Sequence, residues 1–321
     1  MERSRAAKWS LAAYFVLFTA LLYLPMILMA ILSFQGSRGL PYFPMNGFSG
    51  TWWQALFDDS VPGSNADEIR SAALTSLYLG LLVGALTALL AFSLSMAYRK
   101  RFRGDGFLFY LILLGLMTPG FLLSLGTALF WQTMGLQTSW PSLLSEFGGL
   151  ATIGTNTVWA IPFGFLVMVA VWNRYDNRVE EAARDLGAGA MRTFREVTLP
   201  LVWTGIFGAF LFGFVLSWNE YDRTALVIAS GTLTLPIQIF ALTVGSVIRP
   251  DLYALGTATT IFILLVVALV LLVAAFVIWR RGKRQETVSH EARVAEEMGE
   301  IAGIDVDPLE PGSGAAGARA R

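Results

Sequence analysis

The sequence of 321 residues predicts an all-α membrane protein built on a bundle of six transmembrane helices. Hydrophobic residues make up 55% of the chain and charged residues only 14%, and the mean hydropathy is +0.60, far from the balance of a soluble domain. Six stretches without Asp, Glu, Lys or Arg are long enough to cross a bilayer, which takes about 20 apolar residues in a helix. They lack the alternation of barrel strands, so the spans are predicted to be helical.

The six predicted spans cover, in chain order, residues 9–36, 71–98, 107 into the 130s, 147–173, 198–219 and 252–279. The first follows Arg3, Arg5 and Lys8, as the core of a signal peptide would. Its unbroken apolar run is longer than a signal h-region of about 7 to 15 residues, so we expect an uncleaved helix.

Residues 224–248 are also uncharged and raise the alternative of a seventh span. Gly231 and Pro236 divide them into pieces of about a dozen residues at most, too short to cross alone. We therefore expect the outer end of the fifth helix, followed by a short re-entrant or interfacial helix. Within the spans, Pro25, Pro119 and Pro162 are expected to kink their helices.

Basic residues predict the orientation. The N-terminus, residues 99–106, residues 174–195 and the segment after the last span hold three, four, five and four Lys or Arg residues, whereas the alternate loops hold four altogether. The positive-inside rule places the first set, and both termini, in the cytoplasm. The chain then divides into a cytoplasmic N-terminus (1–8), a six-span domain (9–284) with a cytoplasmic loop at about 176–200, and a cytoplasmic tail (285–321) predicted to be disordered or weakly helical.

The loop is polar and amphipathic, and it reads "EEAARDLGAGAMRTFREVTLP". Helical periodicity places two sets of residues on opposite arcs. The polar arc holds Glu180, Glu181, Arg184 and Asp185, and the apolar arc holds Ala182, Ala183, Leu186 and Gly187. Small apolar residues suit close contact with a partner, whereas membrane-surface helices usually present bulky ones. Geometry alone leaves a solvated connection, a membrane-surface helix and a docking helix for a cytoplasmic partner open.

A spaced motif in this loop resembles the EAA loop of bacterial ABC importer permeases. Its positions are Glu181, Ala182, Ala183, Gly187, Val197, Leu199 and Pro200, with Val197 where Ile is usual. The resemblance implies the six-helix fold of a type I (MetI-like) ABC importer permease in the bacterial cytoplasmic membrane, with a separate ATPase supplying the energy. It implies that the loop couples to the ATPase through Glu180, Glu181, Ala182, Ala183, Arg184, Leu186, Gly187, Leu199 and Pro200.

The same resemblance implies the partners: two copies of an ATP-binding subunit, a second homologous permease, an extracytoplasmic substrate-binding protein and the lipid bilayer. No GxxxxGK[ST] sequence occurs here, so ATP and Mg are expected to be used by the partner ATPase. No cofactor, enzymatic activity or nucleic-acid binding is expected of this chain. His290 is its only histidine, so no histidine metal site is predicted.

Two further segments narrow the family. "YLPMILMAILSF" and "YFPMNGFSGTWWQALF" resemble polyamine-type permeases for spermidine and putrescine, so a polyamine is the expected substrate. Related permeases for ferric iron, thiamine, opines and sugars share much of this pattern, and "SWNEY" is also similar to sugar-importer permeases. An ion-gradient-driven transporter is the alternative from another class.

A cationic substrate needs acids and aromatic faces along its path. Trp218, Glu220, Tyr221 and Asp222, at the end of the fifth span, are the predicted pathway residues. The alternative is that they belong to the interfacial belt, where Arg223 pairs with the acids.

Overall fold

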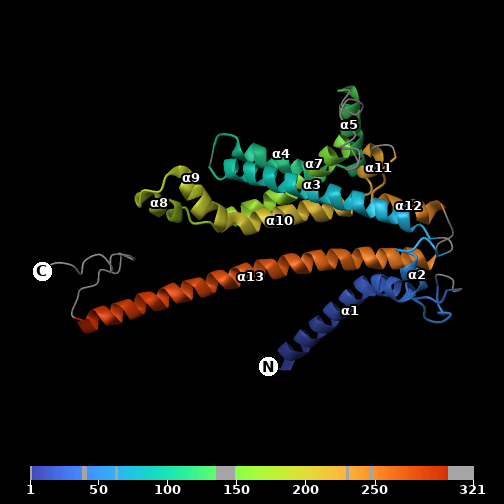
Figure 1. Ribbon diagram of the computed structural model, residues 1–321, viewed down its shortest axis with the longest axis horizontal. Coiled ribbons are helices and arrows are strands. Elements are labelled where there is room, and N and C mark those ends of the chain that lie inside the picture. Colours follow the sequence, from blue (N-terminus) through green and yellow to red (C-terminus); the bar gives the residue numbers. More distant parts are fainter. Residues whose placement is uncertain are drawn as a thin grey trace. The chain divides into compact units, whose positions relative to one another are not determined.

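The computed structural model describes residues 2–37, 42–61, 64–100, 102–134, 149–228, 231–245 and 249–302 (Figure 1). The chain divides into two compact units, Met1–Ile263 and Leu264–Arg321. The fold and the sites described below belong to the first of these units.

The helices follow one another along the chain. They are α1 (Glu2–Leu32), α2 (Thr51–Gln54), α3 (Ala66–Tyr98), α4 (Asp105–Met117), α5 (Gly120–Thr133), α7 (Leu150–Trp172), α8 (Arg178–Asp185), α9 (Ala190–Thr193), the π-helix η2 (Phe194–Thr198), α10 (Leu199–Trp218), α11 (Thr224–Val227), α12 (Leu235–Gly245) and α13 (Pro250–Ala302). Five segments among them are long and apolar enough to cross a membrane, and the pair α4–α5 makes a sixth if counted as one bent span. The predicted helical bundle is confirmed.

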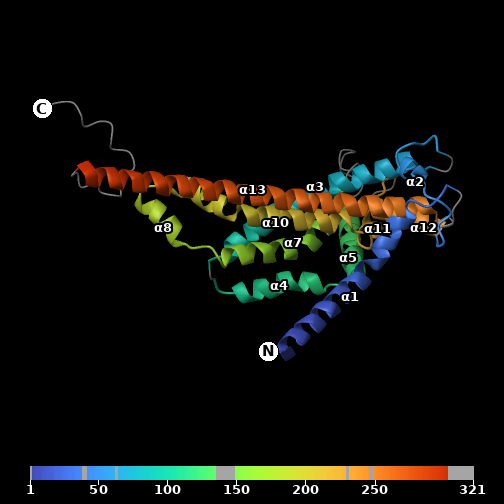
Figure 2. The same ribbon diagram turned by 90° about the horizontal axis from the view of Figure 1, so that it is seen from below.

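The third predicted span is not a single straight helix. α4 and α5 meet at an angle of 104°, and α5 turns away from the direction of α4 in both views (Figures 1 and 2). Thr118 is extended, with ψ of 122°, as expected for a residue before proline. Pro119 cannot continue the hydrogen bonding of α4 because it has no N–H. Pro162, in contrast, lies inside a continuous α7.

In the candidate seventh-span segment, the described residues 224–228 and 231–245 contain two short helices and not one span. α11 has four residues and α12 eleven, and eleven residues of helix extend only about 16 Å. Gly231 lies between them with φ of +86°, a conformation that favours glycine. In the tail, which was predicted to be disordered or weakly helical, α13 continues past Gln285 to Ala302, and residues 303–321 lie outside the described residues.

The core consists of α3, α7 and α10, which lie side by side (Figures 1 and 2). Small residues allow their backbones to approach closely, as is usual where helices pack in membranes. A Cβ added at Gly164 of α7 would come within 3.0 Å of both Ala91 and Thr87 and within 3.2 Å of Ala209. A methyl group at this position would therefore press on both neighbouring helices at once.

The two ends of this core carry different elements (Figures 1 and 2). At one end, Arg99 after α3 bonds to Glu180 of α8. At the other, the backbone N–H of Leu235 in α12 donates to Ser76 Oγ of α3 at 2.8 Å. The predicted 99–106 and 176–200 loops therefore share one end, and the short helices after α10 lie at the opposite end.

Substitution of Gly213 is a test of how much this close packing stabilises the core. A Cβ there would lie 2.7 Å from Thr87 Oγ1 and 2.9 Å from the Gly84 Cα. We expect Gly213→Ala to cost about 1–3 kcal/mol through over-packing and to lower the thermal unfolding temperature of the detergent-purified protein. Gly126→Ala is the matched control, because a Cβ at Gly126 in α5 meets nothing within 4 Å. Equal melting temperatures for the two variants would contradict the packing argument.

Candidate functional site

The loop between α7 and α10 begins with α8, which ends in a glycine-dependent cap. Gly187 has φ of +87°. Its N–H donates to the Arg184 carbonyl at 2.8 Å, and the N–H of Ala188 donates to the Ala183 carbonyl at 3.0 Å. This pair of bonds is the Schellman arrangement, in which glycine at the left-handed position ends a helix. The motif glycine therefore fixes the direction in which the chain leaves α8.

The loop ends in a π-helix, η2, that leads directly into α10. Pro200 lies in the first turn of α10 and has no N–H to donate to the Glu196 carbonyl four residues earlier. The wider turn of η2 lies where this α-helical bond is missing. Single π-turns within helices are rare and frequent at functional sites, and this one joins the loop rigidly to a core helix.

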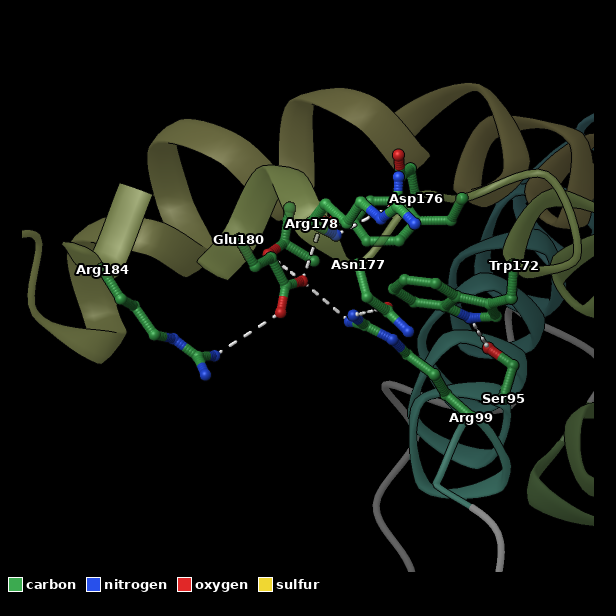
Figure 3. A network of polar contacts seen from close by, with 10 residues as sticks. Ser95, Arg99, Trp172, Asp176, Asn177, Arg178, Glu180 and Arg184 are labelled. Atoms are coloured by element: carbon green, nitrogen blue, oxygen red, sulfur yellow. Dashed lines mark hydrogen bonds and ion pairs between the residues drawn. The ribbon is translucent and has the colours of Figure 1, made fainter. Parts of the chain in front are cut away.

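The carboxylate of Glu180 is the centre of a buried polar network (Figure 3). Its Oε1 accepts hydrogen bonds from Arg99 Nη1 at 2.8 Å, Tyr175 OH at 2.8 Å and Thr198 Oγ1 at 2.7 Å. Its Oε2 faces Arg184 Nη2 at 3.5 Å. Only 8% of Glu180 is exposed. One side chain of α8 thus binds the ends of α3 and α7 and the last residue of η2; we call this group the Glu180 hub.

Arg99 is held on several sides in the hub. Its guanidinium carbon lies 4.8 Å from the ring centroid of Trp172 and 4.6 Å from that of Tyr175, distances at which cation–π attraction operates. Its Nη2 also donates to Asn177. Trp172 in turn donates from its indole N–H to Ser95 Oγ of α3 at 3.0 Å (Figure 3). The cation therefore ties α3 to α7 as well as to α8.

Electrostatics keeps Glu180 charged. Burial alone would raise its pKa, but hydrogen bonds from Arg99, Thr198 and Tyr175 outweigh burial and lower the pKa from 4.5 to about 2. The pKa of Tyr175 is raised, chiefly by burial, so its phenol remains a donor. Because the carboxyl pKa is depressed in the fold, its contribution to stability is complete above pH 4.5 and is lost only as the pH falls through about 2. The hub is therefore fully formed at neutral pH.

The hub divides the predicted polar arc of α8. Glu180 faces the bundle, where groups of this chain bind its carboxylate, whereas Glu181 is exposed. Ala183 is half-buried beside Glu180, whereas Leu186 is 90% exposed. The remaining predicted coupling residues of α8 and its cap are exposed: Glu181, Ala182, Arg184 and Gly187. Leu199 and Pro200 are half-buried at the start of α10.

The predicted pathway residues at the other end of α10 do not form one cluster. Trp218 is buried and lies 4.5 Å, ring to ring, from Phe262. Tyr221 packs on Phe240 at 4.6 Å, and Asp222 is exposed. These side chains point to different neighbours. Residues that are adjacent in sequence therefore do not form one site here.

Glu220 belongs instead to a buried ion pair with Arg223. Glu220 Oε2 lies 2.7 Å from Arg223 Nη1, and its Oε1 accepts the Arg223 backbone N–H at 2.9 Å. The two side chains are 8% and 13% exposed. The guanidinium carbon lies 3.6 Å from the ring centroid of Trp159 in α7, and a Cβ at Gly120 would come within 2.9 Å of its Nη2. The alternative interpretation of the sequence, in which Arg223 pairs with a nearby acid, is therefore correct for Glu220.

A second buried polar group fastens the segment after Arg223 to α7. Asn156 Nδ2 donates to Ser217 Oγ at 3.3 Å and to Thr224 Oγ1 at 3.2 Å. Thr152 Oγ1 donates to the Val227 carbonyl at 3.2 Å. Asn156 and Trp159 are missed by reasoning from sequence, since α7 lies about 60 residues earlier and no local pattern links it to this end of α10. Their polar and aromatic character inside a span is the one available signal.

A bundle of apolar helices long enough to cross a membrane, with an amphipathic polar loop fixed at one end of its core, is the architecture of a multi-pass membrane protein. Residues 80–282 match the family described as "Binding-protein-dependent transport system inner membrane component". The chain belongs to this family of ABC importer permeases and is a multi-pass membrane protein.

Relatives of known role match over most of their length. The spermidine/putrescine transport system permease protein PotC of Escherichia coli (strain K12) is 29% identical over 274 residues, covering 84% of this chain and 93% of the relative. The corresponding PotC of Haemophilus influenzae is 27% identical over 271 residues, covering 84% and 96%. The putrescine transport system permease protein PotI of Escherichia coli (strain K12) is 28% identical over 257 residues, covering 78% and 84%.

The fold is also similar to that of a solved transporter. One chain of a bacterial ABC transporter involved in the import of the acidic polysaccharide alginate matches with a TM-score of 0.59 and 15% identity, covering 84% of this chain and 97% of that chain. This likeness concerns the fold alone.

Glu180 and Glu181 are adjacent acids with opposite environments, which makes them a matched pair for mutation. Glu180→Gln removes the charge that Arg99 needs, and breaking a buried ion pair costs about 3–5 kcal/mol. We expect faster amide hydrogen exchange over residues 178–198 in Glu180→Gln and no change in Glu181→Gln, because Glu181 is exposed. Equal exchange in the two variants would show that the hub does not hold the loop.

Proposed function

We propose that this permease subunit carries polyamines such as spermidine or putrescine into the cell. The support is the similarity to PotC and PotI over most of their length. Their names state their substrates, and the same substrates are inferred for this chain. An acid and a tryptophan face, Glu220 and Trp159, lie together at the end of the core opposite the loop, where a cationic substrate has chemically suitable groups.

The proposed assembly contains two copies of an ATPase, a second homologous permease and an extracytoplasmic substrate-binding protein. ATP and Mg belong to the ATPase. Both termini and the loop lie in the cytoplasm, as the basic residues predict. The exposed residues Glu181, Ala182 and Leu186 contact the ATPase. When ATP closes the ATPase pair, α8 moves with it, and the Glu180 hub transfers that motion to α3, α7 and α10, shifting the bundle between inward-open and outward-open states.

Uptake measurements test the substrate. In cells that lack their own polyamine uptake, expression of the complete transporter should give ATP-dependent accumulation of labelled spermidine or putrescine. Excess unlabelled polyamine should abolish it, and thiamine, ferric iron or sugars should not. Competition by one of those solutes, together with absence of polyamine uptake, would overturn the polyamine assignment and leave the family unchanged.

Co-purification tests the coupling surface. Leu186 is 90% exposed, and burying such a side chain in a partner contributes roughly 1.5–3 kcal/mol. Leu186→Glu should therefore weaken binding of the ATPase about tenfold or more while the permease remains folded. Asp222→Asn, an exposed change at the opposite end, is the control and should leave ATPase recovery unchanged. Full recovery with Leu186→Glu would contradict docking through this face.

A further inference from the structure

Arg223 occupies a small cation site made by other residues of the chain. The indole ring of Trp159 forms one face, with its centroid 3.6 Å from the guanidinium carbon. The carboxylate of Glu220 supplies the opposite charge at 2.7 Å. The backbone of Gly120, at the bend between α4 and α5, leaves room for the guanidinium, because a Cβ there would lie 2.9 Å from Nη2 and 3.0 Å from the guanidinium carbon.

The chemistry of this site is not specific to arginine. An aromatic face attracts any organic cation through its quadrupole, and a nearly buried carboxylate attracts it through charge. A primary ammonium on an alkyl chain satisfies both conditions as well as a guanidinium does. The site thus fits the charged end of an alkylamine, and it is already filled by a side chain of the protein.

Arg223 is also placed so that it can leave. Glu220 and Arg223 are three residues apart, so the ion pair itself joins no distant elements, and the contact of the guanidinium with α7 is its stacking on Trp159. Within the described residues, the Nε of Arg223 is buried without a hydrogen-bond partner, so the guanidinium is less than fully satisfied. The neighbouring bonds of Asn156 to Ser217 and Thr224 would keep α10 and α11 fixed to α7 after the arginine side chain had turned away.

We propose that Trp159 and Glu220 form a binding site for the ammonium group of a transported amine, and that Arg223 fills this site as an internal substitute until a substrate cation displaces it. The identity of that cation as a polyamine rests on the proposed function. The site itself does not, because its geometry requires only an organic cation of ammonium or guanidinium type.

Equilibrium binding of labelled putrescine and of methylguanidinium to the purified complete transporter, without its binding protein and without nucleotide, tests the proposal. Arg223→Ala vacates the site and should bind both probes about tenfold or more tightly than the wild type, as expected for a cation–π contact combined with a charge. Arg223→Gln keeps most of the side-chain volume and should show the same direction of change. In either variant, adding Glu220→Gln should abolish the gain.

The matched control is Asp67→Asn, because Asp67 is an acid at the same end of the core and its side chain is 69% exposed. It should bind the probes as the wild type does. If neither arginine variant gains affinity while wild-type polyamine uptake is intact, the internal-substitute proposal is wrong and the proposed function stands. If the variants bind methylguanidinium in a Glu220-dependent manner but the transporter carries no polyamine, the site stands and the proposed substrate is wrong.

Discussion

The carboxylate of Glu180 is the contact on which the loop's position depends. It joins Arg99, Tyr175 and Thr198, which end or follow three different elements. A buried charge with three donors is stable, whereas the same charge with one donor removed leaves an unsatisfied group at considerable cost. The loop is consequently not a flexible connection. It is attached at α8 by side chains and at η2 by continuous backbone, so a displacement of α8 reaches the core helices directly.

The attachment of the loop can transmit motion only because the core itself is rigid. In α3, α7 and α10 the close contacts involve glycine, alanine and threonine, as at Gly164 and Gly213. Such backbones leave little space for one helix to slide past another, since interiors packed in this way are nearly incompressible. Motion delivered at the loop is therefore expected to move the three helices together. α4 and α5 differ from these helices, because Pro119 breaks their span.

The sequence predicts the spans, the short pieces after α10 and the loop well, because hydrophobic length, proline and glycine act locally. The 104° bend is only partly predictable, since Pro119 indicates a break but not its angle. The environment of a single side chain is harder to predict from the sequence. Helical periodicity places Glu180 and Glu181 on one arc, and only the tertiary contact with Arg99, 81 residues away, shows that Glu180 turns inward. Likewise, the sequence places the predicted pathway residues together because they are neighbours along the chain. The aromatic ring that contacts Arg223, Trp159, comes from another helix.

Two buried ion pairs in the described part of the chain, Arg99–Glu180 and Arg223–Glu220, differ in what they hold together. Arg99 and Glu180 come from elements far apart in sequence, and Tyr175 and Thr198 add to the pair, so separating them would detach a helix. Arg223 and Glu220 are three residues apart, and in the described part of the chain both contacts of the Glu220 carboxylate come from Arg223. Separating this pair requires the Arg223 side chain to rotate away from Glu220 and from the Trp159 ring. Since a competing organic cation restores the lost charge interaction, the exchange need not leave Glu220 unpaired.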